Sequence, residues 1–285
     1  MNRSRGLSPQ GTVPRSPMRR LLLVLALSAP LASASAQGNV LRLSTTTSTE
    51  NSGLLGWLLP QFEAKHGIKV HVISVGSGKA LELAKNGDVD VTLVHARAAE
   101  DRFVADGYGV GRRDVMYNDF VVAGPPGDPA RIAGGKDVLA AFRKIAAADV
   151  RFVSRGDNSG TDVMEKGYWK AVGAMPAGAR YVSAGLGMGE VLNMAAEMQA
   201  YTLADRATYA TYKARTGLAI LVEGDPRMYN PYGIIAVNPD RHKGVNYDGA
   251  RKLIAWITSA EGQARIAAFR PQGQQLFFPS AKPAR

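Results

Sequence analysis

The amino-acid sequence predicts an α/β fold in two lobes, and two observations carry the prediction. First, strand-like and helix-like segments alternate from residue 39 onward with short connections, which is typical of parallel sheets covered by helices. Second, two extended segments run into loops rich in proline and glycine, near residues 121–127 and 224–233, where the chain can cross between lobes. These crossings predict a discontinuous first lobe, residues 39–123 plus 234–276, and a continuous second lobe, residues 124–233.

The first lobe is expected to begin with a strand, a helix and a second strand. Residues 68–74 alternate between apolar and polar side chains, as a half-buried strand does. Five apolar residues between Leu54 and Phe62 fall at helical spacing, and Ser52 is the expected N-cap of that helix. The predicted elements of this lobe are strands 40–44, 68–74, 89–95, 115–124 and 232–237, and helices 54–62, 98–106, 246–258 and 260–269.

The second lobe repeats the alternation after the loop sequence PPGDP. Its apolar residues recur at the spacing of helices in the longer segments and form short continuous runs in the shorter ones. The predicted elements are strands 151–154, 201–203 and 218–222, and helices 137–148, 161–172, 188–198 and 205–214.

The first 36 residues predict a secretory signal peptide. Arg19 and Arg20 precede an apolar run, residues 21–31, which is too short to span a bilayer, and residues 34–36 (ASA) offer a cleavage site. This segment holds five arginines and no acidic residue, so its removal lowers the formal net charge from +11 to +6. The remaining basic residues are scattered, which argues against a nucleic-acid interface, whereas a mildly positive surface favours capture of a small anion.

The sequence contains no cysteine. This excludes disulfides, cysteine-based metal sites, thiol catalysis and a lipid-modified N-terminal cysteine. If the source is a diderm bacterium, an exported chain of this kind is expected to be free in the periplasm.

Four polar loops follow predicted strands at their C-terminal ends. In open α/β sheets ligands bind at these ends, where helix N-termini present free N–H groups and the positive end of the helix dipole. The loops are STTTSTENSG (44–53), VGSG (75–78), SRGDNSGT (154–161) and GLGMGE (185–190). They offer hydroxyls, backbone N–H groups and one arginine, which are all hydrogen-bond donors. Each loop alone is compatible with an ordinary cap or turn, but together they predict an anion site.

The stretch SRGDNSGT permits two other interpretations. GDNSG is one residue away from the GDSGG around many protease nucleophiles, so Ser159 could serve a secreted serine hydrolase. That role needs a histidine base, and His95, at the end of a predicted strand, is the one plausible candidate, although a structural histidine is the simpler interpretation. The Arg-Gly-Asp tripeptide at 155–157 matches adhesion ligands but arises often by chance.

Six longer motifs occur in a fixed order along residues 39–276. They are LRLSTTTSTENSGLL (41–55), VGSGKALELAKNGDVDVTLVHA (75–96), VMYNDFVVAGPPGDP (115–129), FVSRGDNSGTD (152–162), GMGEVLNMAAEMQAYTLADRATY (187–209) and ILVEGDPRMYNPYGIIAVNP (220–239). Together they resemble the substrate-binding proteins of tungstate ABC transporters, the TupA-like branch of the periplasmic binding proteins. The combination is specific, although each motif alone is not.

The resemblance implies a type II periplasmic-binding-protein fold, in which two α/β lobes joined by two crossings close on a tetrahedral oxyanion. It implies a monomer that has neither a catalytic activity nor a cofactor. This monomer captures tungstate, binds tungsten only as that oxyanion, and delivers it to an ABC transporter permease in the inner membrane. The alternatives are a binding protein that prefers molybdate and a binding protein that prefers phosphate. The residues implied to line the site are Thr46, Thr47, Ser77, Gly78, Arg155, Ser159, Gly160 and Thr161, with Arg155 as the sole cation and main bidentate donor.

Asp162 departs from the family pattern, which usually has a histidine after SGT. A carboxylate that faced the ligand would repel a dianion, so we expect Asp162 to turn toward solvent or to cap the following helix. In the alternative, Asp162 accepts a proton from a protonated oxyanion, which would shift the preference toward phosphate-like ligands. Ser77 stands in a VGTG-type loop and keeps the hydroxyl of that pattern.

Overall fold

The computed structural model of the protein describes residues 40–282. The predicted signal peptide, residues 1–36, lies outside this range. Within the range, no helix is both long enough and apolar enough to cross a membrane.

The first lobe is built on three parallel strands. The central strand β1 (Val40–Thr46) pairs with β2 (Lys69–Val75) on one side and with β3 (Val91–Val94) on the other. The apolar side chains of β1, Leu41 and Leu43, are buried in one cluster with the neighbouring helices. Burial alternates over the first half of the strand, and its last four residues are all buried.

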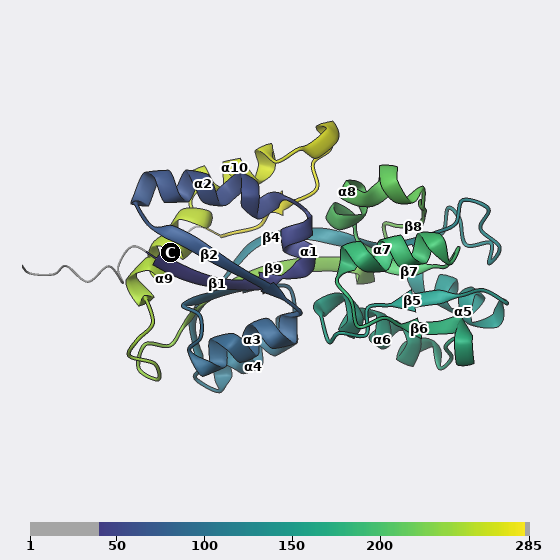
Figure 1. The fold of residues 1–285 in the computed structure, drawn as a ribbon, viewed down its shortest axis with the longest axis horizontal. Coiled ribbons are helices and arrows are strands. Elements are labelled where there is room, and N and C mark those ends of the chain that lie inside the picture. Colours follow the sequence, from purple (N-terminus) through teal and green to yellow (C-terminus); the bar gives the residue numbers. More distant parts are fainter. Residues whose placement is uncertain (1–39, 283–285) are drawn as a thin grey trace, which may run out of the picture. The chain divides into compact units, whose positions relative to one another are not determined.

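Two long strands extend this sheet and carry the chain between the lobes (Figure 1). β9 (Tyr229–Val237) pairs antiparallel with β3 and with β4 (Gly109–Gly124), which in turn pairs with the short β10 (Phe278–Pro279). β4 pairs with β9 as far as Asp119, and from Phe120 it pairs with strands of the second lobe. The predicted lobe limits, at 123/124 and 233/234, lie a few residues away from these changes of partner and stay a prediction.

Helices cover both faces of the first sheet (Figure 1). The helices on one face are α2 (Leu54–His66), α9 (Tyr247–Ile257) and α10 (Ala260–Ala268), and those on the other are α3 (Ser77–Asn86) and α4 (Arg97–Ala105). Phe62 of α2 and Trp256 of α9 meet at a ring distance of 5.7 Å. Burial of one such side chain contributes roughly 1.5–3 kcal/mol to folding, so this pair helps to hold α2 and α9 together on their face of the sheet.

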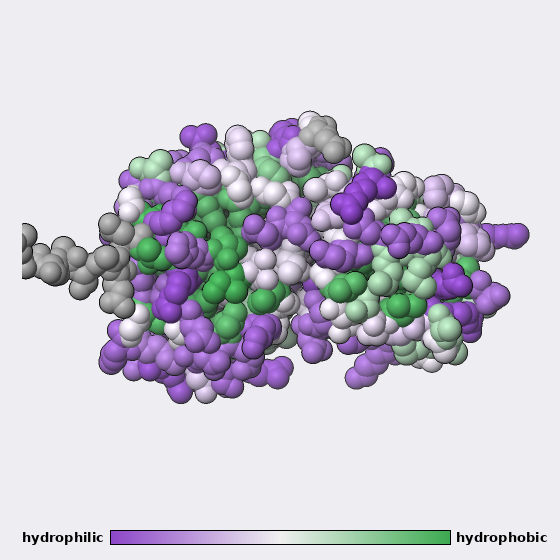
Figure 2. Space-filling view, in the orientation of Figure 1, coloured by the Kyte–Doolittle hydropathy of each residue, from purple (hydrophilic) through white to green (hydrophobic). Residues whose placement is uncertain are grey.

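The edge strand β2 carries an apolar surface patch. Ile73 of β2 is 36% exposed, and apolar side chains gather over this strand in the space-filling view (Figure 2). The patch lies on the first lobe, where β2 ends the sheet.

The second lobe combines the end of β4 with two small groups of strands. β7 (Thr202–Asp205) and β8 (Ala219–Val222) pair antiparallel with β4. β5 (Phe152–Ser154) and β6 (Tyr181–Ser183) form a parallel pair, which is joined to Tyr201 through Phe152.

Four helices cover this second sheet on its two faces. They are α5 (Val138–Ala147) and α6 (Gly160–Val172) on one face, and α7 (Met188–Glu197) and α8 (Arg206–Thr216) on the other. Three short 3₁₀ turns complete the described chain, η2 (Gly178–Arg180), η3 (Pro226–Met228) and η4 (Pro271–Gly273). The predicted alternation of strands and helices is therefore confirmed in both lobes.

Three details of the prediction were wrong. The sheets are mixed rather than parallel, because β4 and β9 cross between lobes directly and do not return through a helix. The polar run after β1 forms a short helix, α1 (Thr47–Asn51), so Ser52 ends α1 instead of capping α2. Gly53 caps α2, with φ at 79°, a left-handed conformation that glycine adopts readily.

Candidate functional site

Three of the four predicted loops meet where the two lobes touch. Arg155, directly after β5, donates from Nη2 to Thr47 Oγ1, directly after β1, over 2.9 Å. The Gly160 N–H, at the start of α6, donates to Ser77 Oγ, at the start of α3, over 3.2 Å. Both bonds join the first lobe to the second, so the loops after β1, β2 and β5 form one polar cluster.

Arg155 is the buried cation of this cluster. Its side chain is 1% exposed, and Nη2 also contacts Asp157 Oδ2 at 2.5 Å. Its Nε and Nη1 have no hydrogen-bond partner among the described residues. A buried guanidinium with unmet N–H groups costs several kcal/mol, and arginine has only donors to offer. The two free donor atoms therefore point to an anion as the missing partner.

Helix N-termini add backbone donors to the same cluster. α6 begins after its N-cap Ser159, whose hydroxyl accepts the Asp162 N–H over 3.2 Å. α3 begins after Gly76, which has no side chain to accept from the first N–H groups of the helix. These N–H groups and the positive end of the helix dipole stabilise a negative charge that lies close to them.

The eight residues implied by the resemblance all lie on these three segments. Thr47, Ser77, Arg155 and Gly160 make the contacts between the lobes. The Thr161 hydroxyl is buried and has no hydrogen-bond partner in residues 40–282. Thr161 thus offers a further buried hydroxyl donor at the start of α6.

The other three residues are engaged in local structure. Thr46 Oγ1 caps α1 and lies 3.1 Å from His95 Nε2, so its hydroxyl already has protein partners. The hydroxyl of Ser159 caps α6 in the same way. At Gly78, a Cβ atom would lie 3.5 Å from the Asn158 carbonyl oxygen of the second lobe. A direct role toward an anion stays a prediction for all eight residues.

The fourth loop, GLGMGE, also reaches the first lobe. Its Gly187 is the N-cap of α7, and a Cβ atom there would lie 3.5 Å from Thr47 Oγ1. The next helix contributes as well, since Thr208 Oγ1 donates to the Ser48 carbonyl oxygen over 3.0 Å. α1 therefore packs against the starts of α7 and α8.

The close approach of the lobes depends on glycine. A Cβ atom on Gly160 would lie 2.7 Å from the backbone oxygen of His95, which is closer than real Cβ atoms come to any neighbour. A Cβ atom on Gly76 would lie 3.0 Å from the Asp157 backbone oxygen. Larger residues at these positions would hold the lobes apart.

His95 belongs to a buried network that the sequence did not reveal. Its Nδ1 lies 2.9 Å from Asn230 Oδ1, and Asn230 Nδ2 donates to Asn118 Oδ1 over 2.7 Å. Nδ1 is therefore the protonated nitrogen, and Nε2 accepts from the hydroxyls of Thr46 and Ser48, at 3.1 and 3.2 Å. The two asparagines come from the crossing strands β9 and β4.

The arrangement of His95 does not support a serine nucleophile. Both ring nitrogens face partners other than Ser159, and the Ser159 hydroxyl accepts from the backbone of its own helix. Burial, together with the positive charge of Arg155, lowers the pKa of His95 to about 4, so the ring is neutral at physiological pH. His95 thus connects α1 and the end of β1 to strand β9 through hydrogen bonds.

The lowered pKa of His95 predicts a specific dependence of stability on pH. Because the unfolded chain takes up a proton near pH 6.5 and the folded chain only near pH 4, the free energy of unfolding should fall as pH is lowered between these values. The expected loss is up to about 3 kcal/mol, and His95→Gln should not show it. Urea unfolding of both proteins from pH 7.5 to pH 4 measures the difference, and parallel pH profiles would contradict a neutral buried His95.

The expectation that Asp162 turns toward solvent was wrong. Its side chain is fully buried, and its carboxylate accepts the backbone N–H groups of Gly156 and Asn158 over 3.0 and 3.1 Å. Lys166 donates to the same carboxylate over 2.6 Å. Asp162 does occupy the first turn of α6, but its side chain holds the preceding loop rather than the N–H groups of the helix.

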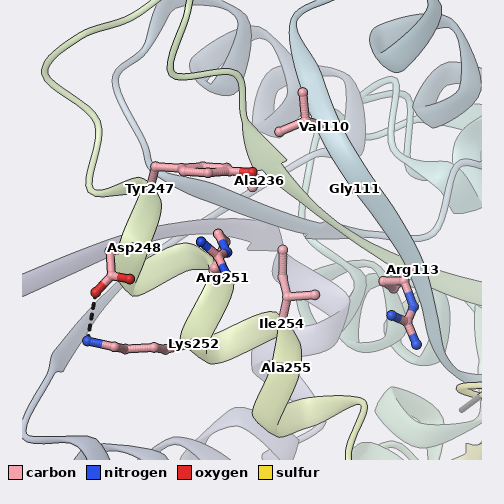
Figure 3. A pocket seen from close by; sticks show the side chains of 10 residues that line it. All are labelled: Val110, Gly111, Arg113, Ala236, Tyr247, Asp248, Arg251, Lys252, Ile254 and Ala255. Carbon is pink, nitrogen blue, oxygen red and sulfur yellow. Dashed lines mark ion pairs between the residues drawn. The ribbon is translucent and has the colours of Figure 1, made fainter. Parts of the chain in front are cut away.

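Surface hollows of the described chain also lie away from this cluster. One of about 520 Å³ lies on the first lobe between α9 and the strands β4 and β9 (Figure 3). Val110, Tyr247 and Ile254 line it with apolar groups, and Arg251 and Lys252 also line it (Figure 3). No group of three or more His, Cys, Asp or Glu side chains within residues 40–282 is arranged to hold a metal ion. The polar cluster around Arg155 remains the candidate site.

Comparison with known proteins identifies the family. A profile described as the PBP superfamily domain matches residues 31–261. The tungstate-binding protein TupA of Peptoclostridium acidaminophilum is 46% identical over 273 residues, which are 92% of this chain and 96% of that protein. The chain belongs to the TupA family.

Solved structures agree with membership of the TupA family. The tungstate ABC transporter protein of Geobacter sulfurreducens is 54% identical, covers 81% of this chain and 98% of its own, and superposes with a TM-score of 0.75. The tungstate-binding protein TupA of Desulfovibrio alaskensis G20 is 47% identical, with coverages of 85% and 99% and a TM-score of 0.73. The predicted two-lobed type II periplasmic-binding-protein fold is thereby confirmed, and these TupA-family relatives are named as binding and transport proteins rather than enzymes.

Proposed function

We propose that the protein captures tungstate between its two lobes and delivers it to the permease of an ABC transporter in the inner membrane. The observation that carries the proposal is the buried Arg155 guanidinium, whose Nε and Nη1 have no partner in the described part of the chain. The relatives named as tungstate-binding proteins support tungstate as the oxyanion.

The site suits an oxyanion that carries no proton, because it presents donors. Arg155 can direct Nε and Nη1 to two oxygens of one tetrahedral anion, as a planar guanidinium does with phosphate and carboxylate. The hydroxyls of Thr47, Ser77 and Thr161 rotate to donate to the remaining oxygens, and the start of α3 adds N–H groups. These fixed donors replace the water that the anion loses on entering the site.

The acidic groups near the site favour tungstate over a protonated phosphate. Asp157 accepts from Arg155 and from the Ser159 N–H, and Asp162 accepts from its own loop and Lys166. Both carboxylates thus already accept hydrogen bonds from donors of the protein, which weakens them as acceptors for a protonated ligand. Discrimination from sulfate, which is also an unprotonated tetrahedral dianion, then rests on the size of the cavity, whereas molybdate stays the near competitor.

The remaining parts of the proposal follow the family. After removal of residues 1–36 the protein acts in the periplasm as a monomer, without a cofactor and without catalysis. Its resemblance to binding proteins and transporter components supports a membrane permease as the partner.

Titration calorimetry on the mature protein tests the function. Tungstate should bind tightly with one anion per chain, molybdate should compete, and sulfate and phosphate should bind far more weakly. No heat with tungstate at micromolar protein would contradict the proposal, whereas a phosphate preference would favour the alternative ligand. Labelling of Ser159 by a fluorophosphonate probe would instead support a hydrolase.

A further inference from the structure

We propose that Asp162 is a positioning residue for the anion loop, which we define as residues 154–159. Its buried carboxylate holds the backbone of this loop from one side, with Lys166 as its counter-ion, and thereby fixes Arg155 on the other. The proposal rests on the proposed function, because it assumes that Arg155 binds the anion.

The geometry of the loop carries the inference. Gly156 and Asn158 both have positive φ, at 62° and 57°, so the chain folds tightly and turns their N–H groups to the same side. Asp162 Oδ1 accepts the Gly156 N–H over 3.0 Å, and Oδ2 accepts the Asn158 N–H over 3.1 Å. The side chains of Arg155 and Asp157, which alternate with these N–H groups along the chain, bond to each other, and Arg155 also donates to Thr47.

The left-handed conformation of Asn158 makes this support necessary. A residue other than glycine with positive φ is strained and persists only where its surroundings hold it. The Asn158 side chain is exposed, but its N–H is bound to a carboxylate that is completely buried. The Asp162 carboxylate therefore offsets the backbone strain at Asn158 and fixes the direction in which the chain continues to Ser159.

Lys166 makes a buried carboxylate acceptable at this position. It lies one helical turn after Asp162, is half exposed at 51%, and donates to Oδ2 over 2.6 Å. Ser154 Oγ also lies 3.3 Å from Asp162, but its single proton goes to the much closer Glu165. Asp162 is thus held by two backbone N–H groups and one ammonium group.

The test combines anion binding with a direct view of the two N–H groups. Asp162→Ala should weaken tungstate binding about 10- to 100-fold, since two charge-assisted hydrogen bonds that fix the loop are lost. Asp162→Asn should weaken it less, because its amide oxygen can still accept from one N–H group. The ratio of tungstate to sulfate affinity should also fall, because a looser loop discriminates size poorly, whereas loss of stability alone would leave this ratio unchanged.

Lys166→Met and Lys252→Met form a matched pair. Lys252 also bonds to an aspartate one turn earlier on its helix, Asp248, but that aspartate is 71% exposed. Lys166→Met should weaken tungstate binding several-fold, and Lys252→Met should change it less than twofold. Equal effects of the two substitutions would overturn the role of Lys166.

Amide NMR spectra separate failure of this inference from failure of the proposed function. In Asp162→Asn the amide resonances of Gly156 and Asn158 should shift strongly, while that of Gly167 stays in place. If the wild-type protein does not bind tungstate, the proposed function fails and the spectra still test the hydrogen bonds. If wild-type binds and folded Asp162→Ala binds within threefold of it, the positioning role is wrong.

Discussion

Arg155→Ala is expected to weaken tungstate binding at least about 1000-fold. The substitution removes the two donor atoms that have no partner in the described protein, and it leaves a buried dianion opposite Asp157 without a cation. Truncating one partner of a buried charge pair costs about 2–5 kcal/mol of binding free energy. Because Arg155→Ala removes two hydrogen bonds to the anion at once, we expect a loss of about 4 kcal/mol or more.

The unliganded Arg155→Ala protein should remain folded. The guanidinium is buried with unmet N–H groups, so its removal takes away a cost as well as two hydrogen bonds. Calorimetry measures the affinity, and urea unfolding without tungstate measures the stability. Arg155→Lys should fall between wild type and alanine, because an ammonium group keeps the charge but not the planar fork. Tungstate affinity close to wild type in Arg155→Ala would place the site elsewhere.

Gly160→Ala is expected to weaken tungstate binding about 10- to 100-fold. The added methyl group would lie 2.7 Å from the His95 backbone oxygen and 2.9 Å from its ring. His95 cannot move aside easily, because Asn230, Thr46 and the ring of Tyr232 surround it. Overpacking of this kind costs about 1–3 kcal/mol. Here the cost destabilises the contact between the lobes that brings Arg155 and Thr47 together.

Gly167→Ala is the matched control for this substitution. Gly167 lies in the same helix, and nothing lies within 4 Å of a Cβ atom built there. Alanine should therefore leave tungstate affinity unchanged and stabilise the helix by up to about 1 kcal/mol. Equal affinities of the Gly160→Ala and Gly167→Ala proteins would show that the close approach at His95 is not needed for binding.

The polar loops could be predicted because each follows a strand. Thr47, Ser77 and Arg155 stand directly or almost directly after β1, β2 and β5, and chain order alone places such positions at the ligand-binding edge of an α/β sheet. Most helices could also be predicted, because the spacing of their apolar residues is a local property of the sequence.

The support behind these loops could not be predicted in the same way. Asn230 bonds to His95 and Asn118 bonds to Asn230, from two strands that are far apart in the chain, and no local pattern links them. The direction of Asp162 depends on two positive φ angles in the preceding loop, and of these only the one at Gly156 is marked by a glycine. The antiparallel pairing of β4 and β9 depends on the crossing between lobes, which spacing within each segment does not describe.

The position of tungsten in crystals grown with tungstate tests the central claim most directly. Tungsten scatters X-rays anomalously, so its position can be found without assuming a site. The account predicts one strong anomalous peak between the lobes, with tungstate oxygens within hydrogen-bonding distance of Arg155 Nε and Nη1 and of the Thr161 hydroxyl. A principal peak in the hollow beside Arg251 and Lys252, or no ordered tungsten near Arg155, would contradict it.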